Sequence, residues 1–573
     1  MRAFRSSTLV WLCLSWLLAL GSFLLMAVQP GLAHPGESGV RYVAQAGQDA
    51  GDCDSPLRPC QTLGYALSQA LKGDQIRVAA GTYFVTPDQA RALLGSVIAV
   101  RGGYRLADGF RVSDPAKNLT YLTGVSFEHR AAFMARGFHV SQDVKGWLRS
   151  LWPKPRQPAQ KMAATSCEAG LAGPAGLAGP YPCLEIDFLG QLTLSDFSSD
   201  PIDANDVWGF VDLNDQREYA LIGLRNGTAV VDVTDPTDPV EVGTISGLDT
   251  LWRDMKVYQF YDQTASRWRA YAYVVADQVD QGLQIIDLTG LPESIALAET
   301  YTGFASAHNI YLGQSDYSTG VSQAGPNGYA VIAGADLDQG AFRLLDLSDP
   351  LAPLETTVPL SGTGYAHDVT TLVITDARTA ACAAGHNPCE LLIDYNESTV
   401  DLWDISDKTE PAMLSSIFYP DSGYVHSGWW SRDKRFVFIQ DEADERSQEL
   451  NTTLRLLDLA DLTNPTVTTV WTGTTSAIDH NGFAKGDRYY ISTYQRGLTV
   501  LDISDPTTPR EVAFFDTYPA ADTANYNGAW GVYPYLPSGT ILVSDIESGL
   551  FLLKEKGVAV TEKRLYLPLI WRR

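Results

Sequence analysis

The sequence lacks the short motifs that mark most hydrolytic and nucleotide-dependent active sites. It has no G-x-S-x-G nucleophile elbow, no H-E-x-x-H signature, no P-loop and no glycine-rich dinucleotide fingerprint. Ser-Gly pairs such as Ser361-Gly362 are typical of turns. The missing motifs favour a non-enzymatic role, assign no catalytic residue, and leave an enzyme of another kind open.

Positive charge is also scarce. The chain has 42 Lys and Arg against 67 Asp and Glu, a formal net charge of −25. A protein that binds nucleic acid needs a basic surface against the phosphates. The composition therefore indicates no nucleic-acid partner, and it fits a solvated acidic surface that attracts cations weakly.

Long apolar runs are confined to the start of the chain. Two arginines precede the run from Leu9 to Val28, and Gly31-Leu32-Ala33 supplies small residues for cleavage. Residues 1–33 are therefore predicted to be an export signal, with an uncleaved membrane anchor as the alternative. The tail, residues 557–573, is too short to cross a bilayer. We expect a secreted or extracellular protein, and surface association without a C-terminal transmembrane anchor stays open.

Cysteine is rare and paired. Of seven cysteines, Cys13 lies in the apolar run, and the other six form the close pairs Cys53/Cys60, Cys167/Cys183 and Cys382/Cys389. An even number, local spacing and an export signal together predict three disulfides. A zinc knuckle is not indicated, because no C-x-x-C spacing occurs.

One strand-and-turn phrase recurs along the chain. It reads GAFRLLDLSDP at 340–350, and related copies stand at 227–236, 282–290, 398–407, 453–462 and 497–506, with a degenerate copy at 549–556. The aspartates that close the phrase are 44 to 59 residues apart, from Asp232 to Asp502. This period is typical of a four-stranded propeller blade with loop insertions. Seven copies predict an all-β, seven-bladed β-propeller over residues 185–556.

The last unit is one strand short. The units begin at Asn205, Trp252, His308, His367, His426, His480 and Trp530, and the seventh stops after its third strand. An open sheet edge would be prone to aggregation. We therefore expect the unpaired segment Leu189 to Phe197 to supply the missing strand and close the ring.

Residues 34–148 form a separate small domain before the propeller. Their PC-x-T-L and GDQIRVAAGTY phrases resemble the start of pectin-lyase-like, right-handed parallel β-helices. The pattern fades before residue 149, so we expect a small truncated β-helix-like domain without a lyase groove. Residues 149–184 are rich in Gly, Ala and Pro and are predicted to be a linker.

The repeat phrase resembles the LVIVD repeat, and dispersed motifs resemble the bacterial choice-of-anchor B family in their order. These include NDVWGF at 205–210, WRDMKVY at 252–258, DEADE at 441–445 and IDHN at 478–481. The resemblance covers about residues 165–555. It implies a secreted or surface-attached propeller and no particular reaction. The sequence has no LPxTG signal, so the mode of attachment stays open.

Four histidines occupy one repeat position. His308, His367, His426 and His480 open the first strands of four successive units. Because the first strands of a propeller line its axis, we expect the imidazoles to converge there. Neutral imidazole is a good ligand for Zn, Fe, Ni or Cu. The possible cofactor is therefore a divalent metal ion; the alternative is a structural role that recurs because each blade has the same need.

Carboxylates are expected at the same end of the axis. Asp368 and Asp479 flank two of the histidines, and Asp441 and Glu442 end a second strand. We predict these four as hydrogen-bonding partners behind the metal ligands.

Three interpretations of function follow. The leading one is a non-enzymatic, secreted or cell-surface propeller that binds a protein or polysaccharide ligand through one face. The second is a metalloprotein with a divalent cation on the axis, extending to a metal-dependent enzyme. The third is a structural component of a surface layer.

Overall fold

A computed structural model describes most of the chain after its first 38 residues. The described residues are 39–94, 98–125, 129–140, 163–172, 181–323, 327–356 and 364–557. The predicted export signal and the tail from residue 558 lie outside them. In the described part, no helix is long and apolar enough to cross a bilayer.

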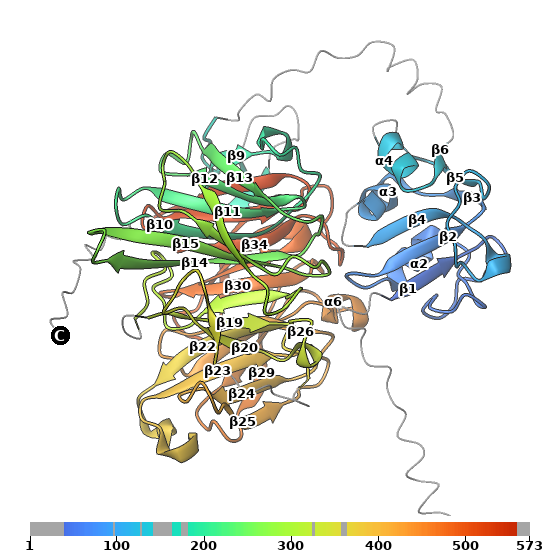
Figure 1. Ribbon diagram of the computed structural model, residues 1–573. Coiled ribbons are helices and arrows are strands. Elements are labelled where there is room, and N and C mark those ends of the chain that lie inside the picture. Colours follow the sequence, from blue (N-terminus) through green and yellow to red (C-terminus); the bar gives the residue numbers. More distant parts are fainter. Residues whose placement is uncertain are drawn as a thin grey trace, which may run out of the picture.

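Seven antiparallel sheets form the predicted seven-bladed propeller (Figure 1). The first four blades are β10–β13 (Ala204–Val211, Glu218–Leu224, Gly227–Asp232, Val240–Ser246), β14–β17 (Arg253–Asp262, Arg267–Ala276, Leu283–Asp287, Ala296–Tyr301), β18–β21 (Asn309–Leu312, Tyr329–Ala333, Arg343–Asp346, Leu354–Glu355) and β22–β25 (Asp368–Ile374, Cys389–Tyr395, Val400–Asp404, Ala412–Ile417). The others are β26–β29 (Val425–Trp430, Phe436–Asp441, Thr453–Asp458, Thr466–Thr472), β30–β33 (Asp479–Lys485, Arg488–Thr493, Gly497–Asp502, Arg510–Phe515) and β34–β36 (Ala529–Tyr533, Thr540–Asp545, Gly549–Glu555) with β9 (Ile186–Leu192).

Strand β9 closes the ring, so the all-β propeller with an N-terminal closing strand is confirmed. It runs antiparallel to β36, with Leu192 opposite Leu550 and Ile186 opposite Glu555. The strand begins and ends earlier in the chain than the segment 189–197 that the sequence suggested. Its residues alternate between buried and half-buried, because one face packs inward on the neighbouring blade.

The repeated aspartate shapes the turn after the third strand in six of the seven blades. In the third blade, the Asp346 carboxylate accepts a hydrogen bond of 2.6 Å from the backbone N–H of Ser348. The same bond, to the residue two positions on, follows Asp232, Asp287, Asp404, Asp458 and Asp502. Aspartate favours such turns because its short side chain mimics a backbone acceptor. The aspartate of the repeat phrase is therefore explained by the turn that it stabilises.

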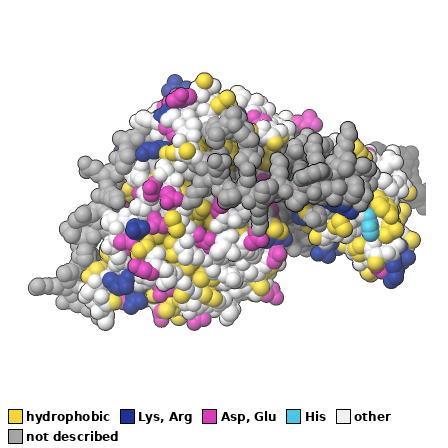
Figure 2. Space-filling model, turned by 90° about the horizontal axis from the view of Figure 1, so that it is seen from above, with side chains coloured by type: hydrophobic (Ala, Val, Ile, Leu, Met, Phe, Trp, Pro, Cys, Tyr) yellow, Lys and Arg dark blue, Asp and Glu magenta, His cyan; other side chains and the backbone are white. Residues whose placement is uncertain are grey.

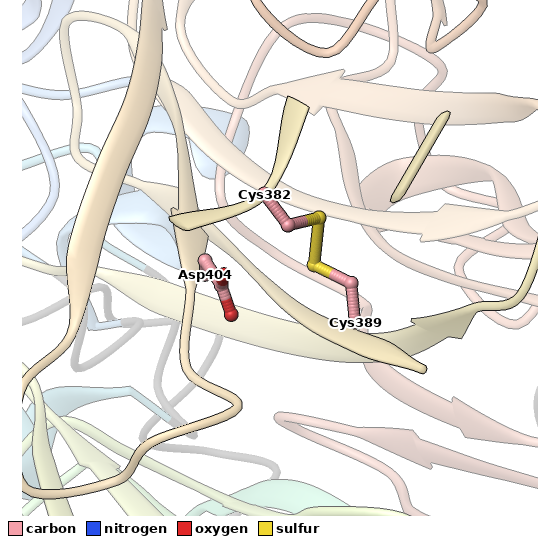
Figure 3. A group of neighbouring side chains, drawn as sticks. All are labelled: Cys382, Cys389 and Asp404. Carbon is pink, nitrogen blue, oxygen red and sulfur yellow. A yellow bond between two sulfur atoms is a disulfide. The ribbon is translucent and has the colours of Figure 1, made fainter. Parts of the chain in front are cut away.

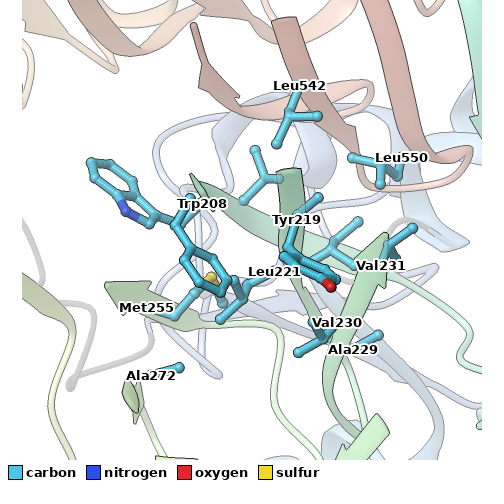
Figure 4. Close-up of a cluster of buried hydrophobic side chains, with 14 of the residues drawn as sticks. Trp208, Tyr219, Leu221, Ala229, Val230, Val231, Met255, Ala272, Leu542 and Leu550 are labelled. Carbon is cyan, nitrogen blue, oxygen red and sulfur yellow. The ribbon is translucent and has the colours of Figure 1, made fainter. Parts of the chain in front are cut away.

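The core lies between blades. Strand β11 is buried along its whole length, whereas the fourth strand β13 is largely accessible. Figure 4 shows Tyr219 and Leu221 of the first blade against Met255 of the second and Leu542 of the seventh. Inner strands therefore bury both faces, as the blade packing of a propeller requires.

In the part of the N-terminal domain that the structure describes, there are two parallel sheets and three short α-helices. One sheet has the order β1-β2-β4 (Val40–Val43, Gln75–Ala79, Ala99–Tyr104) and the other β3-β5-β6 (Gly81–Phe84, Thr120–Thr123, His139–Val140). The helices are α2 (Leu63–Gln69), α3 (Pro87–Leu94) and α4 (Arg130–Ala135). Short parallel strands fit the expected truncated β-helix-like architecture; the finer likeness to pectin lyases stays a prediction.

Part of the expected linker forms strands. β7 (Leu171–Ala172) and β8 (Tyr181–Leu184) extend the sixth blade, where β8 pairs with β33. The composition suggested a linker because glycine and proline disfavour strands, but the disulfide Cys167–Cys183 joins β8 to the segment before β7. The predicted disulfides Cys53–Cys60 and Cys382–Cys389 are also present.

Acidic side chains are dispersed over the propeller. Figure 2 shows Asp and Glu scattered across the visible face among neutral and apolar side chains. The net negative charge is therefore spread over this face and does not gather in one patch.

Candidate functional site

The four histidines converge at one end of the axis. His308 precedes β18, His367 precedes β22, and His426 and His480 lie at the starts of β26 and β30. Successive ring centroids are 4.3, 4.4 and 4.3 Å apart, and each residue is at most 5% exposed. The repeat position thus becomes a buried arc of imidazoles.

Hydrogen bonds fix how the rings point. The Nδ1 atoms of His367 and His480 lie 3.0 and 2.6 Å from the backbone oxygens of His426 and Trp530, one blade further on. A carbonyl oxygen can only accept, so these Nδ1 atoms carry the proton and the Nε2 atoms keep the lone pair. His308 differs, because its Nδ1 lies 2.8 Å from the Asp277 carboxylate.

Burial keeps three of the rings neutral. It lowers the pKa of His367, His426 and His480 well below the usual value, and nearby positive groups act in the same direction. A neutral ring with an anchored Nδ1 atom, as in His367 and His480, presents its Nε2 lone pair as histidine ligands of metals usually do. The donor set therefore fits a divalent transition metal.

An ammonium group from the N-terminal domain fills this position. Lys72 Nζ lies 2.9 Å from Glu442 Oε1, 3.0 Å from His480 Nε2 and 4.3 Å from the centre of the Trp530 ring. The Tyr494 hydroxyl donates to the same Glu442 oxygen at 2.7 Å. Burial lowers the pKa of Lys72, and Glu442 opposes that shift. The centre thus already holds one cation, supplied by the chain itself.

Apolar contacts surround the lysine. Buried side chains of the N-terminal domain, including Leu63, Ala66 and Leu67, form one cluster with residues around the propeller mouth. The propeller residues in that cluster are Leu251, Trp252, Ile478, Tyr494, Tyr526, Trp530 and Ile546. Arg446 adds hydrogen bonds of 3.1 Å to the carbonyl oxygens of Leu67 and Ser68. The N-terminal domain therefore covers the histidine end of the axis.

The predicted carboxylate partners divide into two groups. Glu442 reaches the histidines, at 3.4 Å from His480 Nε2 and 3.6 Å from His426 Nε2. Asp441 instead accepts hydrogen bonds from the Gly423 and Tyr424 backbone and the Tyr419 hydroxyl.

The two carboxylates next to histidines do not bond to the rings in the described structure. Asp479 lies instead with Asp444 and Glu445. Burial raises the pKa of Asp368 to about 7, with a contribution from Asp254. Asp277, at the end of a second strand, makes the only described carboxylate bond to an Nδ1 atom of these four histidines.

One further group of residues of the types that bind metals is explained by a disulfide bond. Cys382, Cys389 and Asp404 lie together, but the two sulfurs form a disulfide (Figure 3). Asp404 accepts hydrogen bonds from the Ala383 and Ser406 backbone. This group therefore has a structural role.

The opposite end of the axis is open. The first strands run from the histidines to a cavity of about 580 Å³, beside which β26 ends at Trp430 and β30 at Lys485. Tyr317 and Tyr535 also line it, with their rings 5.3 Å apart. Lys434 and several amide and hydroxyl side chains complete the wall. We call this cavity the open axial pocket.

The sequence comparison with protein families identifies the repeat. The LVIVD repeat family matches residues 216–246 and 483–517, which contain the third strands of the first and sixth blades. The chain carries LVIVD repeats. Comparison with curated proteins finds no relative.

Three solved structures show how similar this chain is to proteins of known structure. A hypothetical selenium-binding protein of Sulfolobus tokodaii is 12% identical, with 64% of this chain and 96% of that chain covered and a TM-score of 0.38. A Lactobacillus plantarum protein is 13% identical (60% and 89% covered, TM-score 0.37), and a functionally unknown Desulfotomaculum acetoxidans protein is 12% identical (60% and 96%, TM-score 0.36). At these values the likeness carries no conclusion about function.

Sequence reasoning missed two features of this LVIVD propeller. Lys72 lies 370 residues before Glu442, and a lone lysine in a Lys-Gly-Asp turn gives no signal of where it points. The open axial pocket is built from strand ends of several blades, whose residues follow no common pattern.

Proposed function

We propose that this LVIVD propeller is a secreted or cell-surface binding protein whose ligand enters the open axial pocket. One observation carries the proposal: the two ends of the axis differ. The N-terminal domain covers the histidine end, whereas the other end opens into a cavity of about 580 Å³. A cavity of this size, with aromatic walls and a few polar groups, is typical of a ligand site.

The pocket chemistry favours an acidic saccharide. Tyr317, Trp430 and Tyr535 offer flat rings on which a sugar can stack. Lys434 and Lys485 supply ammonium groups in a chain whose net charge is −25. Lys434 donates to the backbone oxygen of Val373, and Lys485 donates to those of Pro534 and Leu536, so each ammonium group keeps at least one donor for a carboxylate.

Location rests on the start of the sequence and on the cysteines. Residues 1–33 have the pattern of an export signal, and three disulfides fit an oxidising compartment. Membership of the choice-of-anchor B family, proposed from the dispersed motifs, supports the same location.

Titration calorimetry with acidic and neutral oligosaccharides tests the proposal. We expect saturable binding of oligogalacturonate or alginate oligomers and much weaker binding of neutral cello-oligosaccharides. Lys485→Gln should lower the affinity for the acidic ligand about tenfold or more, because a hydrogen bond to a charged group contributes about 1.5–3 kcal/mol. Phe418→Leu is the matched control, since Phe418 is 71% exposed and lies outside the pocket. Unchanged binding by Lys485→Gln, or no saccharide binding at all, would refute the proposal.

The anchored histidines favour a second candidate, a metal centre at the covered end. In this reading, Lys72 holds the place of the metal while the N-terminal domain is docked. A Lys72→Ala variant, purified without a histidine tag, should bind one Cu²⁺ or Zn²⁺ per chain more tightly than the wild type. Replacing His367 and His426 with alanine in that background should abolish binding. Absence of stoichiometric metal in Lys72→Ala would exclude this function.

A further inference from the structure

A second group of buried side chains lies beside the histidine centre. Asp444 and Glu445 belong to the short helix α6 (Asp444–Ser447), which follows β27, and Asp479 is the first residue of β30. One carboxylate oxygen from each lies within 4.8 Å of the others. The three residues are 0%, 3% and 1% exposed. We call them the acidic triad.

Most oxygens of the acidic triad have no hydrogen-bond partner. The unpartnered atoms are Asp444 Oδ1, both oxygens of Glu445 and both oxygens of Asp479. Buried polar atoms are nearly always hydrogen-bonded, so five such oxygens at one place call for an explanation. Asp479 comes from a different strand and is aimed into the group formed by α6, which makes it an independent sign of a ligand.

Positive charge near the triad is insufficient to balance it. Arg455 Nη1 contacts only Asp444, through Oδ2 at 2.5 Å. Arg446 lies over the Tyr526 ring and donates one nitrogen to Leu67 and Ser68. Burial raises the pKa of Glu445 well above the usual range, which reflects the cost of its charge in this site.

We propose that Asp444, Glu445 and Asp479 bind a calcium ion. All the orphaned atoms are carboxylate oxygens, which are the ligands of hard cations. Oxygens within 4.8 Å of one another can surround one ion at the Ca–O distance of about 2.3–2.6 Å. Calcium fits better than magnesium, because magnesium keeps several waters whereas this site is enclosed by protein.

The site would act on the contact between the two domains. Arg446, inside α6, binds the end of helix α2, and Glu442, just before α6, binds Lys72. A calcium ion that joins α6 to β30 therefore holds both of these contacts in place. The inference is independent of the saccharide proposal, because the triad lies at the opposite end of the axis from the open pocket.

The test uses the full chain after removal of divalent ions with a chelator. Calorimetry with CaCl₂ alone should show one site, and the Tm should rise steadily with each tenfold increase in Ca²⁺. Glu445→Gln and Asp479→Asn should abolish that rise. Because each variant replaces a buried carboxyl group, whose charged form is costly here, with a neutral amide, it should also raise the Tm of the calcium-free protein. The direction of this Tm change separates loss of a ligand from misfolding, because misfolding would lower the Tm.

Glu449→Gln is the matched control, since Glu449 is exposed and lies four residues after Glu445. It should keep the full calcium response. Three results would overturn the inference: no Ca²⁺ binding by the wild type, an unchanged response in Asp479→Asn, or equal stabilisation by Mg²⁺ and Ca²⁺.

Discussion

Replacing Lys72 with methionine should loosen the N-terminal domain from the propeller. The substitution keeps the apolar stem and removes the ammonium group that pairs with Glu442 at 2.9 Å. The two side chains are only 11% and 3% exposed, so the Glu442 charge would be left buried without its partner. Breaking such a pair costs about 3–5 kcal/mol, which lowers the docking equilibrium roughly a hundred- to several thousandfold.

Hydrogen–deuterium exchange measures this loosening directly. In Lys72→Met, amides of α2 and the start of β30 should exchange faster, while the outer blades should not change. Adding Glu442→Gln should restore most of the protection, because no unpaired charge then remains. Lys117→Met is the matched control: its ion pair with Asp114 is on the surface, the lysine being 82% exposed, and contributes at most about 1 kcal/mol. Equal exchange in wild type and Lys72→Met would refute the role given to this lysine.

Three further outcomes follow from the structure. Burial raises the pKa of Glu547 to about 8 from its unfolded 4.5. The folded state therefore holds a proton that the unfolded state has lost, so stability should fall by about 1.4 kcal/mol per unit as pH rises through that window. Urea unfolding at pH 5, 6.5 and 8 should show a flatter profile for Glu547→Gln; an identical slope would contradict this assignment. Phe188→Ala in β9 removes a fully buried ring and should destabilise the closing blade by about 3–5 kcal/mol, measured by urea unfolding; a loss below 1 kcal/mol would argue against tight closure. Replacing Cys382 and Cys389 with serine should lower the Tm without changing saccharide affinity, because this disulfide lies outside the pocket; a parallel loss of affinity would show a link between them.

The sequence was sufficient to predict the blades because their signals are local. Six of the seven third strands end in an aspartate whose hydrogen bond reaches only two residues along the chain, as Asp346 shows. The sequence shows three strands in the last repeat unit and four in the others, which predicted a missing strand, and β9 supplies it. The convergence of His367 and His426 also followed, since equivalent positions of a repeat occupy equivalent places.

The partners of the candidate site could not be predicted in the same way. Lys72 reaches the axis through the docking of a whole domain, which no local pattern encodes. Asp479 was expected to orient His480, because the two are neighbours in sequence. In the structure the pairing of β30 is irregular between Asp479 and Asn481, and the two side chains belong to different groups, His480 to the histidine centre and Asp479 to the acidic triad. Neighbours in sequence therefore do not share a site here.

The closing strand sets the order in which this protein can be completed during synthesis. β9 leaves the ribosome before any blade, but its partner β36 follows roughly 350 residues later. At about 5–20 residues per second, β9 waits roughly 20–70 seconds with an open edge. The N-terminal domain also waits for the last blade, because its docking surface includes Trp530 and Ile546. The closing strand and the N-terminal domain are therefore both secured late, and a chain truncated before Trp530 would leave both without their partners.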